Sequence, residues 1–245
     1  MKKYGLIGKQ IEHSFSPSFF SKKFKNEGIS DSEYHLFPLQ KISDFITLID
    51  QQPALKGLNV TIPYKTEILP YLDEISPQAA AIGAVNTIKF TGGLLSGFNT
   101  DVYGFQHSLK LHLSEHHYHS TALILGSGGA SKSVMYALNQ LGIKHQIISR
   151  KKTNDRLTYT DLKHEIIKRN LIIINTTPLG MSPETNTCPN LPYEAIGKDH
   201  LLFDLVYNPA QTLFMKNGIN RGATVVNGLQ MLHLQAEKSW EIWQK

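Results

Sequence analysis

The segment NVTIPYK at residues 59–65 carries polar side chains at the end of a strand-like run and a lysine directly behind the break. Asn59 and Thr61 flank a β-branched valine, as in a strand with one buried face, and Pro63 then stops the strand. A positioned amine is able to give a proton to a reacting oxygen, or to take one from it. Lys65 is therefore the first candidate for chemistry, against the plain alternative of a surface lysine.

A second candidate lies in the glycine-rich segment GSGGAS at residues 126–131, between an apolar run and an amphipathic helical pattern. Gly126 permits a tight turn, and Gly128 lets the backbone approach a pyrophosphate, which the N-terminus of the helix then binds. The third glycine of the usual dinucleotide fingerprint is Ser131 here, and a glycine-rich turn alone is often only a turn. The order of strand, loop and helix nevertheless predicts a nucleotide site.

The next strand-like run ends in IISRKKTN at residues 147–154, and this end indicates which nucleotide is bound. An NAD site places an acidic residue about 20 residues beyond the glycines, where it binds the ribose 2′-hydroxyl. This chain has Arg150, Lys151 and Lys152 there and no carboxylate. We predict NADP as the cofactor, because cations suit a 2′-phosphate; a solvated charge run is the alternative.

The composition is that of an ordinary globular protein, and the 245 residues favour two domains. No apolar run approaches the roughly 20 residues of a membrane span, so no membrane association is expected. Cys188 is the only cysteine, which excludes an internal disulfide and favours a reducing, cytoplasmic location. The net charge of +5 comes from scattered cations, which favour small anionic ligands over nucleic acid.

The first hundred residues predict a mixture of strands and helices. Residues 2–8 and 55–62 read as strands, and a helix is expected to open at Ser16-Pro17 with Ser16 as its N-cap. Residues 66–76 are predicted to be helical, which would put Lys65 at a helix start. Residues 84–99 contain a Gly-Gly turn and predict a hairpin.

After a predicted helix at about 102–113, the pattern changes to short apolar runs separated by helical or looped stretches. The runs are TALILG, HQIISR, LIIIN, LLFDL and ATVVN. Continuous apolar strands with intervening helices indicate a parallel sheet covered on both faces. We therefore predict an α/β protein with a mixed-sheet domain at 1–101 and a Rossmann-like domain at 102–228. The final helix, 229–245, is expected to pack back onto the first domain.

Polar stretches in both predicted domains form one ordered set. They are HSFSP (13–17), NVTIPYK (59–65), AVNTI (84–88), GFNTD (97–101), NTTPLGM (175–181), DLVYNP (204–209) and NGLQMLHLQA (227–236). In this order, over nearly the full chain, they resemble the shikimate dehydrogenase family. The resemblance implies a substrate domain, an NADP-binding Rossmann domain and a cleft between them. It also implies reversible reduction of 3-dehydroshikimate to shikimate, a step of the chorismate pathway in aromatic amino acid biosynthesis.

The resemblance assigns roles to single residues. Lys65 matches the catalytic lysine and Asp101 its carboxylate partner; Asp101 is also expected to cap the helix that follows it. The positions that match substrate contacts are Ser14, Ser16, Asn59, Thr61, Asn86, Tyr207 and Gln235. The positions that match the pyrophosphate loop and the 2′-phosphate clamp are Gly126, Ser127, Gly128, Gly129, Ala130, Ser149, Arg150 and Lys151. The positions that match the surroundings of the nicotinamide are Thr176, Leu205 and Gly228.

Some positions depart from the family pattern. Ser149 and Asn154 replace the asparagine and the second arginine usual in the 2′-phosphate segment, which leaves room for a quinate/shikimate dehydrogenase that prefers NAD. A non-catalytic relative that senses NADP is the alternative from another class. The histidine cluster at 112–119 is expected to be an exposed connection, and no metal site is predicted. The oligomeric state stays open between monomer and homodimer.

Overall fold

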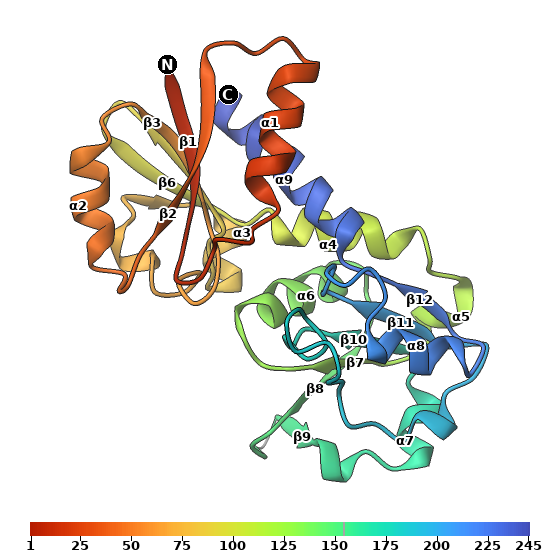
Figure 1. Ribbon diagram of the computed structural model, residues 1–245. Coiled ribbons are helices and arrows are strands. Elements are labelled where there is room, and N and C mark those ends of the chain that lie inside the picture. Colours follow the sequence, from red (N-terminus) through yellow and green to blue (C-terminus); the bar gives the residue numbers. More distant parts are fainter. Residues whose placement is uncertain (154) are drawn as a thin grey trace. The chain divides into compact units, whose positions relative to one another are not determined.

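The computed structural model describes residues 1–153 and 155–245, which form two compact units (Figure 1). The first unit combines both ends of the chain, Met1–Thr100 and Gln235–Lys245, and the second comprises Asp101–Leu234. Asn154, in the predicted 2′-phosphate segment, lies outside the described residues. No helix in the described ranges is long and apolar enough to cross a membrane.

The first unit is built on a six-stranded mixed sheet with the order β2-β1-β3-β5-β6-β4. Its strands are β1 (Lys2–Gly8), β2 (Ser32–Pro38), β3 (Leu55–Val60), β4 (Glu74–Ile75), β5 (Thr87–Thr91) and β6 (Leu94–Phe98). The pairs β1–β2, β1–β3 and β4–β6 are parallel, whereas β3–β5 and β5–β6 are antiparallel. The predicted hairpin is thus β5–β6, and its Gly92-Gly93 turn has φ angles of 60° and 87°, which glycine adopts without a steric penalty.

Helices from opposite ends of the chain meet in the first unit. They are α1 (Ser16–Asn26), α2 (Asp44–Gln51), α3 (Pro77–Ile82) and the end of α9 (Leu229–Gln244). Figure 1 shows α9 beside α1, where Lys23 forms an ion pair with Glu237. Phe20 and Phe24 of α1 pack with Trp243 of α9 against Tyr4. This aromatic cluster fixes the last helix on the sheet.

The predicted helix at 66–76 is wrong. Residues 62–68 form turns, followed by a single 3-10 turn, η1 (Leu69–Tyr71), and by the short edge strand β4. Pro70 lacks an N–H donor and disfavours helical geometry at the residue before it, so a longer helix does not form. Lys65 therefore lies in a turn and not at a helix start.

The second unit contains a six-stranded, fully parallel sheet with the order β12-β11-β10-β7-β8-β9. Its strands are β7 (Ala122–Leu125), β8 (His145–Ser149), β9 (Arg156–Thr158), β10 (Ile172–Asn175), β11 (Leu201–Asp204) and β12 (Thr224–Val226). Counted along the chain, these strands stand in the order 3-2-1-4-5-6 of dinucleotide-binding folds, with the reversal between β7 and β10. The predicted Rossmann-like sheet is confirmed; the short, polar β9 was not anticipated.

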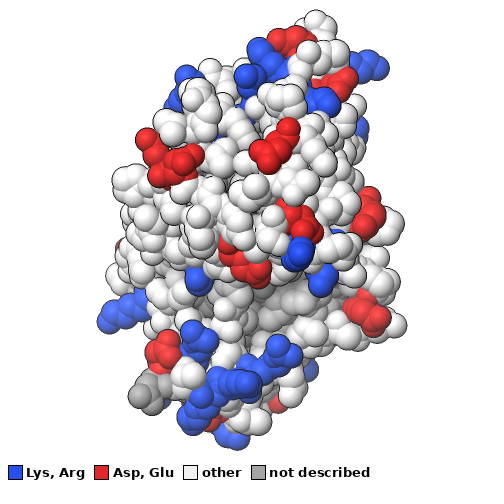
Figure 2. Space-filling model, turned by 90° about the vertical axis from the view of Figure 1, so that its left-hand side faces the viewer, with Lys and Arg blue, Asp and Glu red and all other residues white. Residues whose placement is uncertain are grey.

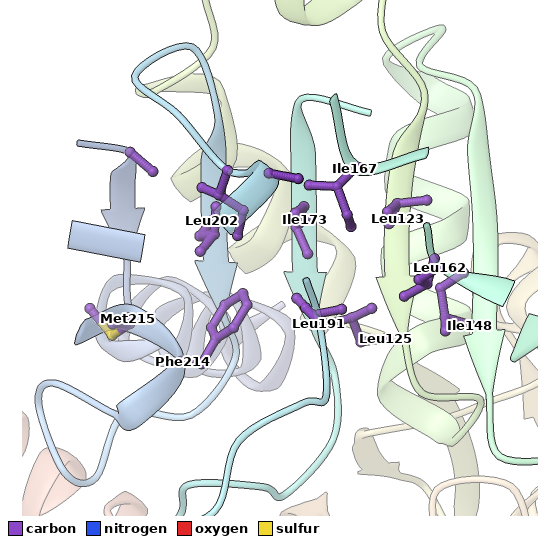
Figure 3. Packing of buried hydrophobic residues seen from close by; sticks show 13 residues of the cluster. Leu123, Leu125, Ile148, Leu162, Ile167, Ile173, Leu191, Leu202, Phe214 and Met215 are labelled. Atoms are coloured by element: carbon purple, nitrogen blue, oxygen red, sulfur yellow. The ribbon is translucent and has the colours of Figure 1, made fainter. Parts of the chain in front are cut away.

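Helices and loops cover both faces of this sheet, which explains its continuous apolar strands. The helical segments are α4 (Asp101–Lys110), α5 (Glu115–Tyr118), α6 (Gly129–Gln140), η2 (Tyr159–Asp161), α7 (His164–Arg169), η3 (Tyr193–Ala195) and α8 (Leu213–Ile219). On one face, Phe105 of α4 meets Phe203 edge-on. On the other, Leu123, Ile173 and Leu202 from three neighbouring strands pack in one cluster with Phe214 of α8 (Figure 3).

The histidine cluster is less exposed than expected. His117 in α5 is only 5% exposed. Its Nδ1 lies 2.8 Å from the Ser114 hydroxyl, and its Nε2 lies 3.2 Å from the carbonyl oxygen of Asp199. Burial lowers the pKa of His117. His117 therefore fixes the connection to the sheet, and no group of three or more His, Cys, Asp or Glu in the described part of the chain could hold a metal ion.

Candidate functional site

The glycine-rich loop joins the carboxyl end of β7 to α6 and has the geometry of an anion site. Gly126 has φ of 111°, and a Cβ there would lie 2.7 Å from Thr176 Oγ1, so only glycine fits. Gly128 precedes α6 without a side-chain cap, and a Cβ on it would meet nothing within 4 Å. The first N–H groups of α6 are therefore available to a phosphate. Ser131 is buried in place of the third glycine, and its hydroxyl donates to Gly128 O over 2.7 Å.

The basic turn after β8 is organised by Ser149, the last residue of that strand. Its hydroxyl donates to the carbonyl of Lys151 over 2.6 Å, while Arg150 and Lys151 are exposed. Figure 2 shows Lys and Arg side chains gathered over the end of the second unit where β8 and β9 lie. Lys152 instead pairs with Asp161 at 3.2 Å. Hydrogen bonds from Thr158, together with this lysine, hold the pKa of Asp161 at about 2.

Three of the predicted cofactor residues follow neighbouring strands, where the carboxyl ends of a parallel sheet bind ligands. Thr176 follows β10 and donates its hydroxyl and its N–H to Leu125 O over 2.7 and 2.9 Å. Leu205 follows β11. Gly228 follows β12, donates its N–H to Val206 O over 3.1 Å, and would bring a Cβ within 2.1 Å of Leu205 O. The second unit thus gathers Thr176, Leu205 and Gly228 at the sheet edge that carries the glycine-rich loop.

Two polar residues at this edge were not singled out from the sequence. Asn175 and Asp204 end β10 and β11 at matching positions of the sheet, and neither side chain is accessible to solvent. Asn175 donates to Asp204 Oδ1 over 2.9 Å. Burial raises the pKa of Asp204 to about 6. The signal available in the sequence was a polar residue at the end of two otherwise apolar runs, LIIIN and LLFDL.

In the first unit, several predicted substrate positions join one buried polar cluster. Asn86 accepts the N–H of Thr100 over 2.7 Å and donates to the Thr100 hydroxyl over 3.0 Å. Gln235 of α9 accepts from Asn86 and from Thr100 over 3.4 Å each. Gln235, which the resemblance assigns to the substrate, is therefore held in the same unit as Asn86.

Asn59 is bound on both sides by protein groups. Its Oδ1 accepts the hydroxyl of Tyr34 over 2.8 Å, and its Nδ2 donates to Ser239 Oγ over 2.9 Å. Burial raises the pKa of Tyr34, against a hydrogen bond to Ser16 that lowers it. The Ser239 hydroxyl also lies 2.8 Å from that of Thr87. Tyr34, Thr87, Thr100 and Ser239 were not predicted as part of this site. Ser239 was detectable from the sequence, because it lies four residues after Gln235 on one helix face.

The start of α1 differs by one residue from the expectation. Ser16 is the first helical residue and Phe15 precedes it, so Ser16 is not the N-cap. The Ser14 hydroxyl accepts the N–H of Ser16 over 3.3 Å instead. Ser14 and Ser16 thus lie together at an N-terminus that carries the positive end of a helix dipole.

Lys65 is anchored in the first unit by the segment that contains Asn86, and Asp101 is the first residue of the second unit. The carbonyl of Lys65 accepts the N–H of Val85 over 2.7 Å, and its side chain is half-buried. Asn86, the next residue, holds Thr100, and α4 begins at Asp101 with a buried side chain. Asp101 is thus in the first turn of the helix rather than its N-cap.

The remaining two predicted substrate positions follow strands. Thr61 comes directly after β3, is half-buried, and donates its N–H to Ile7 O over 2.9 Å. Tyr207 follows β11 in the second unit and is half-buried.

Fold and sites define a dinucleotide-binding α/β protein with a second, mixed-sheet unit that holds a polar cluster. The sequence profile of the shikimate dehydrogenase substrate binding domain matches residues 6–88. A shikimate dehydrogenase (NADP(+)) from Methanococcus maripaludis is 40% identical to the chain over 258 residues, which cover 99% of this chain and 91% of the relative. The chain belongs to the shikimate dehydrogenase family.

Solved structures show the same relationship. The crystal structure of shikimate dehydrogenase 1 from Peptoclostridium difficile has a TM-score of 0.83 and 37% identity, covering 100% of this chain and 92% of that one. The shikimate 5-dehydrogenase from Thermus thermophilus, solved in complex with NADP(H) and shikimate, has a TM-score of 0.86 and 29% identity, covering 99% and 93%. The two-domain α/β fold of the family is therefore present over the whole chain.

Proposed function

We propose that this protein is an NADP-dependent shikimate dehydrogenase, which reversibly reduces 3-dehydroshikimate to shikimate in aromatic amino acid biosynthesis. The observation that carries the proposal is the full-length match to shikimate dehydrogenases (NADP(+)). The glycine loop and the turn with Arg150 and Lys151 support it on the cofactor side. The single, half-buried Cys188 supports a reducing cytoplasm as the place of the reaction.

We infer that the Rossmann unit holds the cofactor. The uncapped start of α6, from Gly129 to Ser131, would bind the pyrophosphate. Arg150 and Lys151 would bind the 2′-phosphate, with Ser149 holding their backbone in its turn. When bound, NADPH supplies the hydride for the reduction.

Reduction of a ketone also requires a proton on the carbonyl oxygen, because a free alkoxide is too basic to form readily in water. We infer that Lys65 donates this proton in the reduction and accepts it in the oxidation. The backbone of Lys65 is fixed by Val85, which limits the positions of its amine. Asp101 is proposed as the carboxylate that orients the ammonium group.

The substrate would be held by groups around the polar cluster. Ser14 and Ser16, at the start of α1, are proposed to bind its carboxylate. Thr61, Asn86, Tyr207 and Gln235 are proposed to bind its ring oxygens. Both ends of the Asn59 amide already have protein partners, so we infer that it contributes by holding Tyr34 and Ser239 in place.

The decisive test is the variant Lys65→Ala. We expect kcat to fall by about 10²–10⁴-fold, the range of a lost proton donor, while the dissociation constant of NADPH measured by fluorescence stays unchanged. Lys25→Ala, at an exposed lysine of α1, is the matched control and should keep full activity. Near-normal turnover of Lys65→Ala would remove the lysine from the mechanism.

A second candidate, a quinate/shikimate dehydrogenase that prefers NAD, is favoured by the composition of the basic turn. Lys152 is engaged by Asp161, and lysine lacks the planar fork with which arginine binds phosphate. Steady-state rates with shikimate and quinate, each with NADP and NAD, separate the two enzymes. Retained NADPH binding without turnover of any of these substrates would instead indicate a non-catalytic relative.

A further inference from the structure

Asp204 is a fully buried carboxylate that the proposed reaction does not use. It ends β11, and its side chain is 0% exposed. A buried carboxylate is costly unless hydrogen bonds satisfy its oxygens. Three donors do so here: Asn175 Nδ2 at 2.9 Å and Val206 N–H at 3.0 Å on Oδ1, and the Thr212 hydroxyl at 2.6 Å on Oδ2.

The three donors belong to three different segments. Asn175 ends β10, Val206 lies in the loop after β11, and Thr212 is the N-cap of α8, where it accepts the N–H of Met215 over 3.3 Å. An ionised carboxylate accepts from all three directions, whereas an amide would turn its own donors toward one of them. Asp204 therefore acts as the common acceptor that joins these segments.

The segments joined by Asp204 carry the residues assigned to the nicotinamide. Asn175 also accepts the N–H and the hydroxyl of Thr177, over 3.0 and 2.6 Å. These bonds fix the backbone directly after Thr176. The N–H of Leu205 donates to Asn175 O over 3.0 Å. Val206 in turn accepts the N–H of Gly228. Two of the three donors thus connect Asp204, through two hydrogen bonds each, to Leu205, to Gly228 and to Thr177, the neighbour of Thr176. The third donor, Thr212, connects it to α8.

We propose that Asp204 is a positioning residue for hydride transfer, which holds the loops bearing Thr176, Leu205 and Gly228 in the arrangement that the nicotinamide ring needs. The inference rests on the proposed function, because it concerns the reaction of the bound cofactor. It predicts that loss of the carboxylate slows hydride transfer more than it weakens the binding of NADPH and shikimate. The reason is that small misplacements of a reacting group slow a reaction strongly.

The test is Asp204→Asn, which keeps the side-chain volume. We expect kcat to fall at least about 10-fold while the NADPH dissociation constant and the shikimate KM change less than about 3-fold. The primary deuterium isotope effect on kcat, measured with NADPH deuterated at the transferred position, should rise, because hydride transfer becomes more rate-limiting. A role limited to fold stability would not move this isotope effect.

The matched control is His200→Asn, at the residue directly before the other end of β11. His200 is buried and lies 3.1 Å from Ile167 O through Nε2, and Gly197 N–H donates to its Nδ1 over 3.0 Å. We expect this variant to lower the melting temperature while leaving kcat and the isotope effect unchanged. The inference is overturned if Asp204→Asn is destabilised but keeps wild-type kcat and isotope effect.

A second pair of variants keeps the inference testable if Asp204→Asn does not fold. Thr212→Val removes one of the three donors and should shift kcat and the isotope effect in the same direction by a smaller amount. Thr212→Ser keeps the hydroxyl and should restore both. Equal values in the Val and Ser variants overturn the inference. If the wild-type protein has no dehydrogenase activity, both the proposed function and this inference are overturned. If the wild type is active, the variants test the role of Asp204 alone.

Discussion

At the scale of single residues, the buried polar groups of this protein take their hydrogen-bond partners from distant parts of the chain. Ser239 lies within 2.9 Å of Asn59, 2.8 Å of Thr87 and 3.2 Å of Thr100, and it donates to Gln235 O. Such a cluster stabilises the fold only when every member is satisfied. The proposed substrate residues Asn86 and Gln235 are held here by Thr100 and Ser239, which orient their side chains.

Asp204 gives this protein a specific dependence of stability on pH. The pKa of Asp204 in the folded state, about 6, exceeds the ordinary value of 3.8. At pH values between these two, the folded state holds a proton that the unfolded state has lost. Stability from this group is therefore fully present below pH 3.8 and is lost as pH rises toward 6. Relative to Asp204→Asn, the wild-type free energy of unfolding should fall by on the order of 3 kcal/mol across this window.

Urea denaturation of both proteins at several pH values between about 4 and 7 measures this difference. Comparison with the variant removes the contribution of other groups, such as Asp161, whose pKa is lowered. The quantity compared is the free energy of unfolding of the wild type minus that of Asp204→Asn. A value that stays constant with pH, or rises with it, would contradict a raised pKa of Asp204 in the folded state.

At the scale of elements, the last helix is held by a contact that a single methyl group would break. A Cβ on Gly57 of β3 would lie 2.2 Å from Trp243 Nε1, and this nitrogen donates to Ile88 O over 2.9 Å. The indole therefore lies directly on the backbone of the sheet. Glycine is present at this position for close packing and not for a turn.

Gly57→Ala should destabilise the protein by about 1–3 kcal/mol, the usual cost of overpacking a close contact. Tryptophan fluorescence should change with it, because the ring must leave its position over β3. Gly197→Ala is the control, since a Cβ there meets nothing within 4 Å. Equal melting temperatures for the two variants would show that the packing of Trp243 on β3 does not require glycine at position 57.

The elements that the sequence predicted well are those whose signals are local. The β5–β6 hairpin follows from Gly92-Gly93, and α6 follows from a glycine loop before an amphipathic run. Prediction failed for residues 66–76, where a helical apolar pattern was overridden by Pro70 and by pairing of β4 with β6. That pairing is invisible to local periodicity, because its partner lies some twenty residues later.

At the scale of the whole molecule, the first unit cannot be completed by one continuous stretch of chain. Gln235–Lys245 returns to Met1–Thr100 and supplies Ala236 and Trp243 to the aromatic cluster. It also supplies Gln235 and Ser239 to the polar cluster. The predicted substrate positions of the first unit therefore depend on the last residues of the chain.

A chain that ends at Leu234 should lose the ordered first unit and keep the second. Hydrogen exchange should show lost protection in β1 and β3, because their apolar cover is gone, and retained protection in β7 and β10. A chain that ends at Gln244, lacking only the exposed Lys245, is the control and should exchange like the full chain. Protection that persists in β1 after removal of 235–245 would contradict this dependence.

The sequence by itself determined the parallel and mixed sheets and the glycine loop, because periodicity, glycine and proline act through neighbours along the chain. The family followed from the order of the polar stretches, through their resemblance to shikimate dehydrogenases. Only the tertiary structure decided which buried polar groups support the site, since their partners are far apart in sequence. Asp204 meets Asn175 across 29 residues, and Asn59 meets Ser239 across 180. A hydrogen bond depends on distance in space, and folding alone brings these groups within reach of one another.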